Sequence, residues 1–283
     1  MKRAIALIVS LSLSLFFLAA PARAEDPLSP VIIVSHATAA VDAPKNTLAG
    51  IRKSKELGAP WVEYDIRWTK TDGTASYSGW PVLSHDDDLA IATNCTGSIA
   101  NTGLNATLAC FANDYAPWKG DIRYANEKVP YGYDFLNVTR QEGLRPLFDV
   151  KVTPNRVQMD KLMYYVDMFS GMREELIYMG SAQNIATVKP WYPDLEYMLI
   201  EYPTQGTQRH PANILSLGID HYALPWSHID PVTIQSYHDR GVSMFVWTSD
   251  NPAYDTAENM QTLLDAGVDG IITNQPDIAV GLL

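Results

Sequence analysis

The feature of this sequence that most constrains its fold is the regular alternation of short apolar runs with segments of helical spacing. The β-branched run Val31–Ser35 is typical of a parallel strand that is buried on both faces. Residues 46–57 have apolar side chains at helical spacing, and Gly58 ends the segment. This pairing recurs to the end of the chain. The predicted strands are 31–35, 61–66, 146–151, 176–179, 197–200, 219–224, 242–247 and 269–273, and the predicted helices are 46–57, 133–142, 156–170, 183–190, 231–240 and 256–266.

Roughly eight strand–helix units predict an α/β protein with a closed (β/α)8 barrel, the TIM barrel. An open, doubly wound sheet is the alternative. That fold normally carries a Gly-rich phosphate loop after its first strand, and the sequence contains neither G-x-G-x-x-G nor a Walker sequence. The barrel is therefore the favoured architecture.

One stretch interrupts the alternation. After a short extended piece at 81–84, residues 86–129 are rich in Asn, Thr, Gly and Tyr and have weak periodicity. We interpret them as a loop-rich insertion after the second strand, lying over one face of the barrel, and not as a second domain. Both cysteines of the chain, Cys95 and Cys110, fall in this insertion. In an exported protein such a pair is expected to form a disulfide.

The amino-terminal segment predicts export. Lys2 and Arg3 precede an apolar run over 4–20, and Ala22 and Ala24 place small residues where a signal peptidase acts. We therefore expect a signal peptide at 1–24, a single mature domain at 25–283, and a secreted or periplasmic location. A retained membrane anchor is the alternative, but the run is short for a bilayer span and no later stretch is apolar enough.

The charge of the chain restricts its partners. The formal charge is −11, and removal of Lys2, Arg3 and Arg23 with the signal peptide takes away three positive charges, which leaves about −14. So acidic a chain argues against nucleic-acid binding, which needs basic patches. An anionic phosphodiester still binds where a bound cation reverses the local field.

Three carboxylates are expected at one end of the barrel. Glu63 and Asp65 lie on one face of the second predicted strand because they are two residues apart, and Asp149 lies on the next strand. Carboxylates this close repel one another unless a cation compensates them. Hard oxygen ligands favour one divalent cation, Ca²⁺ or Mg²⁺. The alternative is that they are surface carboxylates at strand ends.

Two histidines and a lysine accompany the acids. His36 follows the first strand, His85 follows the extended piece, and Lys151 stands two residues after Asp149. Either histidine alone is more often a hydrogen-bonded structural residue. Together they are suited to phosphodiester cleavage, which needs a base for the attacking oxygen and an acid for the leaving one. Lys151 is expected to contact the phosphate, and Trp247 either packs the barrel or walls the alcohol side of the substrate.

The chain resembles the glycerophosphodiester phosphodiesterase family. The resemblance covers nearly the whole mature chain in the right order, and each block alone is modest. The blocks are Ser35-His36, Pro44-Lys45-Asn46-Thr47, Trp61-Val62-Glu63-Tyr64-Asp65, Thr71-Asp72-Gly73, Val82-Leu83-Ser84-His85-Asp86, Phe148-Asp149-Val150-Lys151, Met244-Phe245-Val246-Trp247-Thr248, Gly267-Val268-Asp269-Gly270-Ile271-Ile272-Thr273-Asn274 and Pro276-Asp277.

The resemblance implies a TIM barrel, a divalent cation held by Glu63, Asp65 and Asp149, and His36 and His85 as the acid–base pair. It also implies that a neighbouring substrate hydroxyl attacks phosphorus and that water then opens the cyclic phosphate.

Three positions depart from the family pattern. Ala37 stands where an arginine is usual, Lys45 stands where an acid is usual, and the third ligand is Asp149 instead of glutamate. Our hypothesis is that Lys45 takes over part of the missing arginine's charge, although lysine does not copy a bidentate contact.

Hydrolysis of glycerophosphodiesters to glycerol 3-phosphate is the favoured function. The Asp149-x-Lys151 form and a cysteine-closed loop also resemble the related sphingomyelinase D and phospholipase D toxins, which act on lipids, so a lysolipid substrate is an alternative. A barrel that has lost catalysis and only binds a ligand is the third reading. The sequence carries no signal for an oligomeric state.

Overall fold

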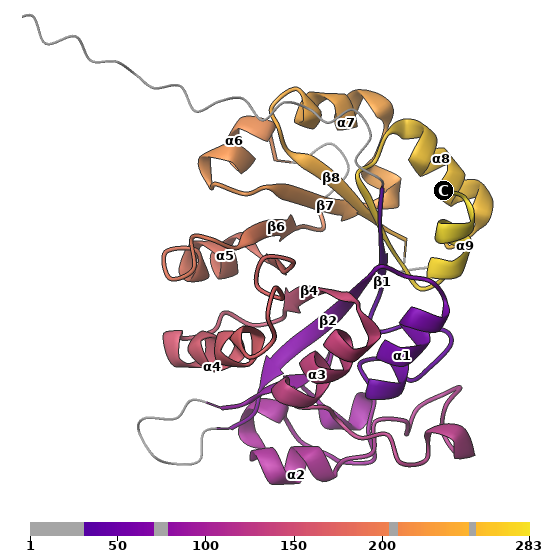
Figure 1. Ribbon diagram of the computed structural model, residues 1–283, viewed down its shortest axis with the longest axis vertical. Coiled ribbons are helices and arrows are strands. Elements are labelled where there is room, and N and C mark those ends of the chain that lie inside the picture. Colours follow the sequence, from indigo (N-terminus) through magenta and orange to yellow (C-terminus); the bar gives the residue numbers. More distant parts are fainter. Residues whose placement is uncertain (1–30, 71–78, 204–208, 249–252) are drawn as a thin grey trace, which may run out of the picture. The chain divides into compact units, whose positions relative to one another are not determined.

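The computed structural model describes residues 31–70, 79–203, 209–248 and 253–283 (Figure 1). The predicted signal peptide at 1–24 lies outside these residues, as does most of the turn before residue 81 and the Thr71-Asp72-Gly73 block. Residues 31–283 form one compact unit. Within the part of the chain that is described, no helix combines the length and the apolar character needed to span a bilayer.

The eight predicted strands form a closed parallel barrel, which confirms the predicted TIM fold. Each barrel strand pairs with its neighbours in the order β1-β9-β8-β7-β6-β5-β4-β2, and β1 also pairs with β2, so the sheet closes on itself (Figure 1). The strands are β1 (Ile32–Ser35), β2 (Trp61–Trp68), β4 (Arg145–Val150), β5 (Ile177–Gly180), β6 (Glu196–Ile200), β7 (His221–Pro225), β8 (Ser243–Trp247) and β9 (Gly270–Thr273).

Helices surround the strands. They are α1 (Leu48–Glu56), α3 (Gly132–Glu142), α4 (Arg156–Asp167), α5 (Ala182–Val188), α6 (Pro211–Ser216), α7 (Pro231–His238), α8 (Ala257–Ala266) and α9 (Pro276–Gly281) (Figure 1). Sequence periodicity missed α6 and α9. Each has only six residues, fewer than two turns, so no repeating apolar stripe develops. Both begin with proline, which suits the first turn of a helix.

Alternation along the strands divides the core into two parts. Trp61, Leu147, Met198 and Phe245 belong to a cluster inside the barrel, while Tyr64 belongs to the larger cluster between strands and helices. In β2 the inward positions change from apolar Trp61 to acidic residues two and four positions later. Because successive strand side chains point to opposite faces, this register directs the acids into the barrel.

The strand β3 (Pro81–Leu83) pairs antiparallel with the end of β2 and leads into the insertion. The insertion is more ordered than its composition suggested. It contains the short helices η1 (Leu89–Ile91), η2 (Ile99–Asn101), α2 (Leu104–Ala109) and η3 (Ile122–Tyr124). A small apolar cluster around Val82, Leu89 and Ile99 packs its first half, and a second cluster joins Trp118 and Tyr124 to Ala43.

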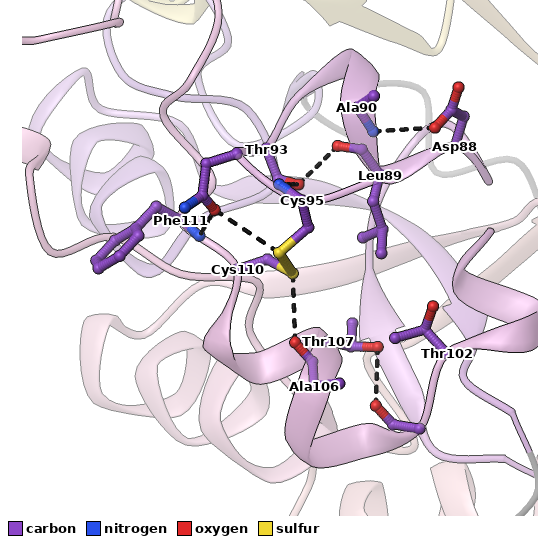
Figure 2. Close-up of a disulfide and its surroundings, with 12 residues drawn as sticks. Asp88, Leu89, Ala90, Thr93, Cys95, Thr102, Ala106, Thr107, Cys110 and Phe111 are labelled. Carbon is purple, nitrogen blue, oxygen red and sulfur yellow. Dashed lines mark hydrogen bonds between the residues drawn. A yellow bond between two sulfur atoms is a disulfide. The ribbon is translucent and has the colours of Figure 1, made fainter. Parts of the chain in front are cut away.

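Cys95 and Cys110 are joined as a disulfide inside the first of these clusters (Figure 2). The surrounding backbone is held by side chains, since Thr93 Oγ1 accepts from the Cys95 N–H at 3.1 Å and Asn94 Oδ1 accepts from the Phe111 N–H at 2.8 Å. The insertion also contacts the loop before α1: the Lys45 N–H donates to the Tyr115 hydroxyl at 2.6 Å. It therefore covers that loop.

Candidate active site

The centre of the site is a buried group of three acids. Glu63 and Asp65 of β2 and Asp149 of β4 are 1%, 0% and 6% exposed, and one carboxylate oxygen of each lies within 4.8 Å of the other two. In the β2–β4 ladder Asp65 is the register partner of Asp149, which places the two side chains on the same face. The structure thus brings together all three predicted ligands.

Lys151 closes one side of this group. Its ammonium lies 2.8 Å from Asp65 Oδ1 and also contacts Asp149 Oδ2. Among the described residues, this ammonium is the only polar contact of the buried Asp65 Oδ1. One lysine offsets only one of the three acidic charges. The group therefore carries excess negative charge in a buried place, which a cation would compensate.

The protonation behaviour of the acids follows from this crowding. Burial raises the pKa of Glu63 well above its ordinary value, and the neighbouring Asp65 raises it further. Burial likewise raises the pKa of Asp149. Asp65 differs: although burial opposes its ionisation, Lys151, His85 and His36 hold its pKa at about 2. One carboxyl of the cluster thus tends to keep a proton while Asp65 stays ionised.

Asn46 holds Asp65 in place, a role that sequence reasoning did not assign. Its Nδ2 donates to Asp65 Oδ2 at 2.6 Å, and its Oδ1 accepts from the Asp65 N–H at 3.1 Å. Asn46 has a φ of +57°, in the left-handed region that asparagine tolerates better than most residues. An asparagine directly before the helix cap Thr47 was the available signal.

The loop between β1 and α1 also holds Glu63. The Ala37 N–H donates to Glu63 Oε2 at 2.6 Å. Ala37, Thr38 and Ala39 all have positive φ values, 42°, 61° and 59°, and all three are buried. Such a run is unusual for residues with a β-carbon, and nothing in the sequence indicated it. The backbone at the position of the expected arginine therefore binds an acid of the cluster.

His36 lies at the end of β1. Its Nδ1 is 2.7 Å from Asn274 Oδ1, just after β9. Both His36 and His85 are close enough to Asp65 to lower the pKa of that acid. The first predicted histidine is therefore at the acidic cluster.

His85 follows β3 and has a more open setting. Its side chain is 48% exposed, and its Nδ1 lies 3.2 Å from Asp86 Oδ1. The Arg67 guanidinium donates to the His85 carbonyl from Nε at 3.0 Å and from Nη2 at 2.7 Å. Both contacts restrain the segment that carries the imidazole, while the ring itself remains accessible to a ligand.

Lys45 lies beside Asp86, the residue that contacts His85. Its ammonium is 3.7 Å from Asp86 Oδ2 and 5.7 Å from the centre of the Tyr115 ring. Its charge thus reaches the His85–Asp86 pair.

Trp247 lies at the end of β8, is 3% exposed, and belongs to the apolar cluster inside the barrel. Its ring also packs against Tyr202, with 4.9 Å between the ring centres, and Tyr202 is 68% exposed. Tyr202 borders a cavity of about 420 Å³ that Glu201 and Arg209 also line. Trp247 therefore packs the barrel and supports an exposed aromatic residue at the strand ends.

A larger cavity of about 490 Å³ lies between α7 and α8 and is lined by Trp226, Ile229 and Leu263, among others. It includes none of the acids or histidines described above, so its volume does not bear on the acidic site.

The chain is similar to known proteins over most of its length. A sequence model described as the glycerophosphoryl diester phosphodiesterase family matches residues 36–278. A glycerophosphodiester phosphodiesterase from Caldanaerobacter subterraneus is 24% identical over 258 residues, covering 89% of this chain and 97% of that protein. Human glycerophosphodiester phosphodiesterase 1 is 30% identical over 125 residues, which cover 44% of this chain and 35% of that protein.

Solved structures share the fold. An Oleispira antarctica phosphodiesterase in complex with the product sn-glycerol-3-phosphate superposes with a TM-score of 0.75 at 19% identity, covering 89% of this chain and 96% of that one. A glycerophosphodiester phosphodiesterase from Agrobacterium tumefaciens gives a TM-score of 0.73, covering 89% and 100%. Since the family model matches residues 36–278, which is most of the chain, the chain belongs to the glycerophosphoryl diester phosphodiesterase family.

Proposed function

We propose that this protein is a metal-dependent phosphodiesterase that hydrolyses glycerophosphodiesters to glycerol 3-phosphate and an alcohol. The observation that carries the proposal is the buried Glu63–Asp65–Asp149 cluster, with two imidazoles beside it, in a chain of this family. A cluster of acids alone would repel an anionic substrate. With a cation added, the same cluster attracts a phosphodiester.

The residues present fit one hard divalent cation. Glu63, Asp65 and Asp149 supply carboxylate oxygens within 4.8 Å of one another, and Lys151 offsets only one of their three charges. Oxygen-only ligation suits Ca²⁺ or Mg²⁺ and not a softer metal. When bound, such a cation polarises the phosphoryl oxygens and offsets the charge that develops on them.

The two histidines carry the proton transfers. One imidazole takes the proton of the substrate hydroxyl next to the ester as that oxygen attacks phosphorus, and the other gives a proton to the departing alcohol oxygen. The P–O bond to the alcohol breaks as the new P–O bond closes a cyclic phosphate. Water then opens the ring with the roles reversed, so each histidine regains its starting proton state.

Other side chains position the substrate. Lys151 places its ammonium at the edge of the acids, where it also contacts a phosphate oxygen. Lys45 supplies a second positive charge near His85 through Asp86. Tyr202, which packs on the buried Trp247, forms an aromatic wall on the side of the leaving alcohol.

The protein acts outside the cytoplasm. The basic, apolar and small-residue order of residues 1–24 supports export to the periplasm or the medium. The Cys95–Cys110 pair supports the same location, because a structural disulfide persists in an oxidising compartment.

A lipid-directed activity is the second candidate. Its support is the Asp149-x-Lys151 pair together with a cysteine-closed loop that begins ten positions after His85. In that case the choline-bearing part of a lysolipid or sphingolipid leaves and the cyclic phosphate persists.

The two candidates are separated by products. Mature protein is incubated with glycerophosphocholine, lysophosphatidylcholine or sphingomyelin, each with Ca²⁺, with Mg²⁺ or with chelator, and the reaction is followed by phosphorus NMR. We expect glycerol 3-phosphate from glycerophosphocholine, only with metal. A persistent cyclic phosphate from a lipid would instead support the second candidate.

The variant His36→Ala serves as the control for contaminating activity. We expect it to lose on the order of 100-fold or more in kcat, because a positioned acid or base contributes about that factor. Absence of turnover of all three substrates with either metal would sink the proposal and favour a barrel that only binds a ligand.

A further inference from the structure

A chain of buried polar side chains runs from His36 away from the acidic cluster. His36 Nδ1 lies 2.7 Å from Asn274 Oδ1, and Asn274 Nδ2 donates to Asp255 Oδ2 at 3.1 Å. Asp255 is 2% exposed and Asn274 is 6% exposed. These two hydrogen bonds involve none of Glu63, Asp65 and Asp149.

Asp255 is held by two threonines at the ends of neighbouring strands. Thr273 Oγ1 donates to Asp255 Oδ1 at 2.5 Å, and Thr248 Oγ1 donates to the same oxygen. The Thr273 hydroxyl also accepts from the Gln275 N–H at 3.0 Å, which leaves its own proton for the carboxylate. Three donors thus converge on one buried carboxylate, so both of its oxygens serve as acceptors in this network.

The carboxylate decides which way the Asn274 amide faces. An ionised carboxylate only accepts hydrogen bonds, so the NH₂ end of the amide must point to Asp255. The carbonyl end then points to His36, and a carbonyl also only accepts. His36 Nδ1 must therefore be the donor in this bond.

We propose that Asp255 and Asn274 are positioning residues that set the tautomer of His36. In the neutral imidazole the single proton then resides on Nδ1, and the lone pair is on Nε2, the nitrogen that faces away from Asn274. Nε2 is thereby the atom through which His36 exchanges a proton with the substrate, and the same atom serves in both half-reactions. The inference deepens the proposed function, since it assumes that His36 is one of the acid–base pair.

The test compares two variants of similar shape at position 274. Asn274→Leu removes both polar ends of the side chain. Asn274→Asp keeps an acceptor for Nδ1, and a proton shared with Asp255 restores the donor end. Two-bond proton–nitrogen correlation spectra of protein with ¹⁵N-labelled histidine report the tautomer directly. The chain has six histidines, and the His36 signals are assigned with His36→Gln.

We expect neutral His36 to carry its proton on Nδ1 in the wild type and in Asn274→Asp, and to shift toward the Nε2 form in Asn274→Leu. For glycerophosphocholine hydrolysis we expect Asn274→Leu to lose on the order of 100-fold in kcat, with a smaller change in KM. Asn274→Asp is expected to recover most of that loss. Thermal melting of both variants shows whether each remains folded.

Two outcomes overturn the inference. The first is a wild-type His36 with its proton on Nε2, whatever the enzyme's activity. The second is an equal loss of kcat in both variants with an unchanged tautomer, because a purely structural role of Asn274 gives that result. The spectra need no substrate. If neutral His36 carries its proton on Nδ1 in the wild type and shifts toward the Nε2 form in Asn274→Leu, the inference is supported even if glycerophosphodiesters are not turned over.

Discussion

Asn46 and Asp65 are joined by two hydrogen bonds of opposite direction, from Asn46 Nδ2 to Asp65 Oδ2 at 2.6 Å and from the Asp65 N–H to Asn46 Oδ1 at 3.1 Å. The first orients a carboxylate of the proposed metal site, and the second ties the backbone of β2 to the loop before α1. Asn46 makes both bonds from a left-handed backbone, with a φ of +57°.

Two replacements of Asn46 separate the contribution of its hydrogen bonds from the contribution of its left-handed backbone. Asn46→Gly loses the bonds but keeps an easy left-handed backbone, whereas Asn46→Ala also adds roughly 1 kcal/mol of backbone strain. We expect both variants to lose catalysis to a similar extent, with Asn46→Ala less stable by about that amount in urea unfolding. Equal stability of the two would show that the left-handed backbone contributes nothing.

Metal binding and pH should be linked through Glu63. Its pKa in the folded protein lies well above 4.5, so between 4.5 and that raised value the metal-free folded state holds a proton that the unfolded state has lost. The stabilising contribution of Glu63 to the free energy of unfolding is therefore fully present below pH 4.5 and is lost as pH rises through the raised pKa. We expect metal-free protein to lose stability over this range.

A bound cation prevents this loss of stability because it takes the place of the proton on Glu63. The rise in Tm on adding Ca²⁺ or Mg²⁺ should therefore be larger at pH 8 than at pH 5, measured against a chelator-treated sample. Glu63→Gln is the matched control, since a neutral amide of the same shape should flatten the pH dependence without metal. A metal-induced rise in Tm that is the same at both pH values would contradict this account.

Lys45 should affect catalysis through its charge near His85. We expect Lys45→Ala to lower kcat/KM for glycerophosphocholine by roughly tenfold, which corresponds to about 1.4 kcal/mol, the scale of one hydrogen bond to a charged group. Lys119→Ala is the matched control, because Lys119 also pairs with an acid in the insertion, Asp114, at 2.9 Å. Unchanged kinetics of Lys45→Ala would eliminate the idea that this lysine replaces the missing arginine's charge.

The disulfide should hold the insertion together. Cys95 and Cys110 are 15 residues apart, and closing a loop of that length stabilises a protein by about 3 kcal/mol in the chain-entropy account. We expect reducing agent to increase proteolysis within 86–129 while the barrel stays resistant. A Cys95→Ser/Cys110→Ser variant should be equally sensitive with and without reductant, and unchanged proteolysis of the reduced wild type would count against the role.

Much of the site could be predicted from the sequence because its determinants are local. The two-residue spacing of Glu63 and Asp65 places both on one face of a strand, and the order of strands and helices along the chain specifies a barrel. Asp149 and Lys151 repeat the same spacing on the next strand. These inferences needed only two rules: side chains alternate between the two faces of a strand, and the carboxyl ends of parallel strands meet at one edge of the sheet.

The rest depended on contacts between distant parts of the chain. His36 and Asn274 are 238 residues apart and meet only because β1 pairs with β9 to close the barrel. The left-handed backbone at 37–39 is held by surrounding packing, since alanine and threonine do not favour it by themselves. The insertion has too few periodic residues to predict its order, which arises from a small apolar cluster around its cysteines.

The sequence by itself therefore determined which residues face into the barrel, because strand alternation is a property of neighbouring residues. Only the tertiary structure decided which polar atoms meet there, and so which carboxyl keeps a proton, which asparagine holds Asp65, and which nitrogen of His36 is left to act. Hydrogen-bond partners and pKa values depend on distances of a few ångströms across the closed sheet, and those distances exist only once β2 has paired with β4 and β1 with β9.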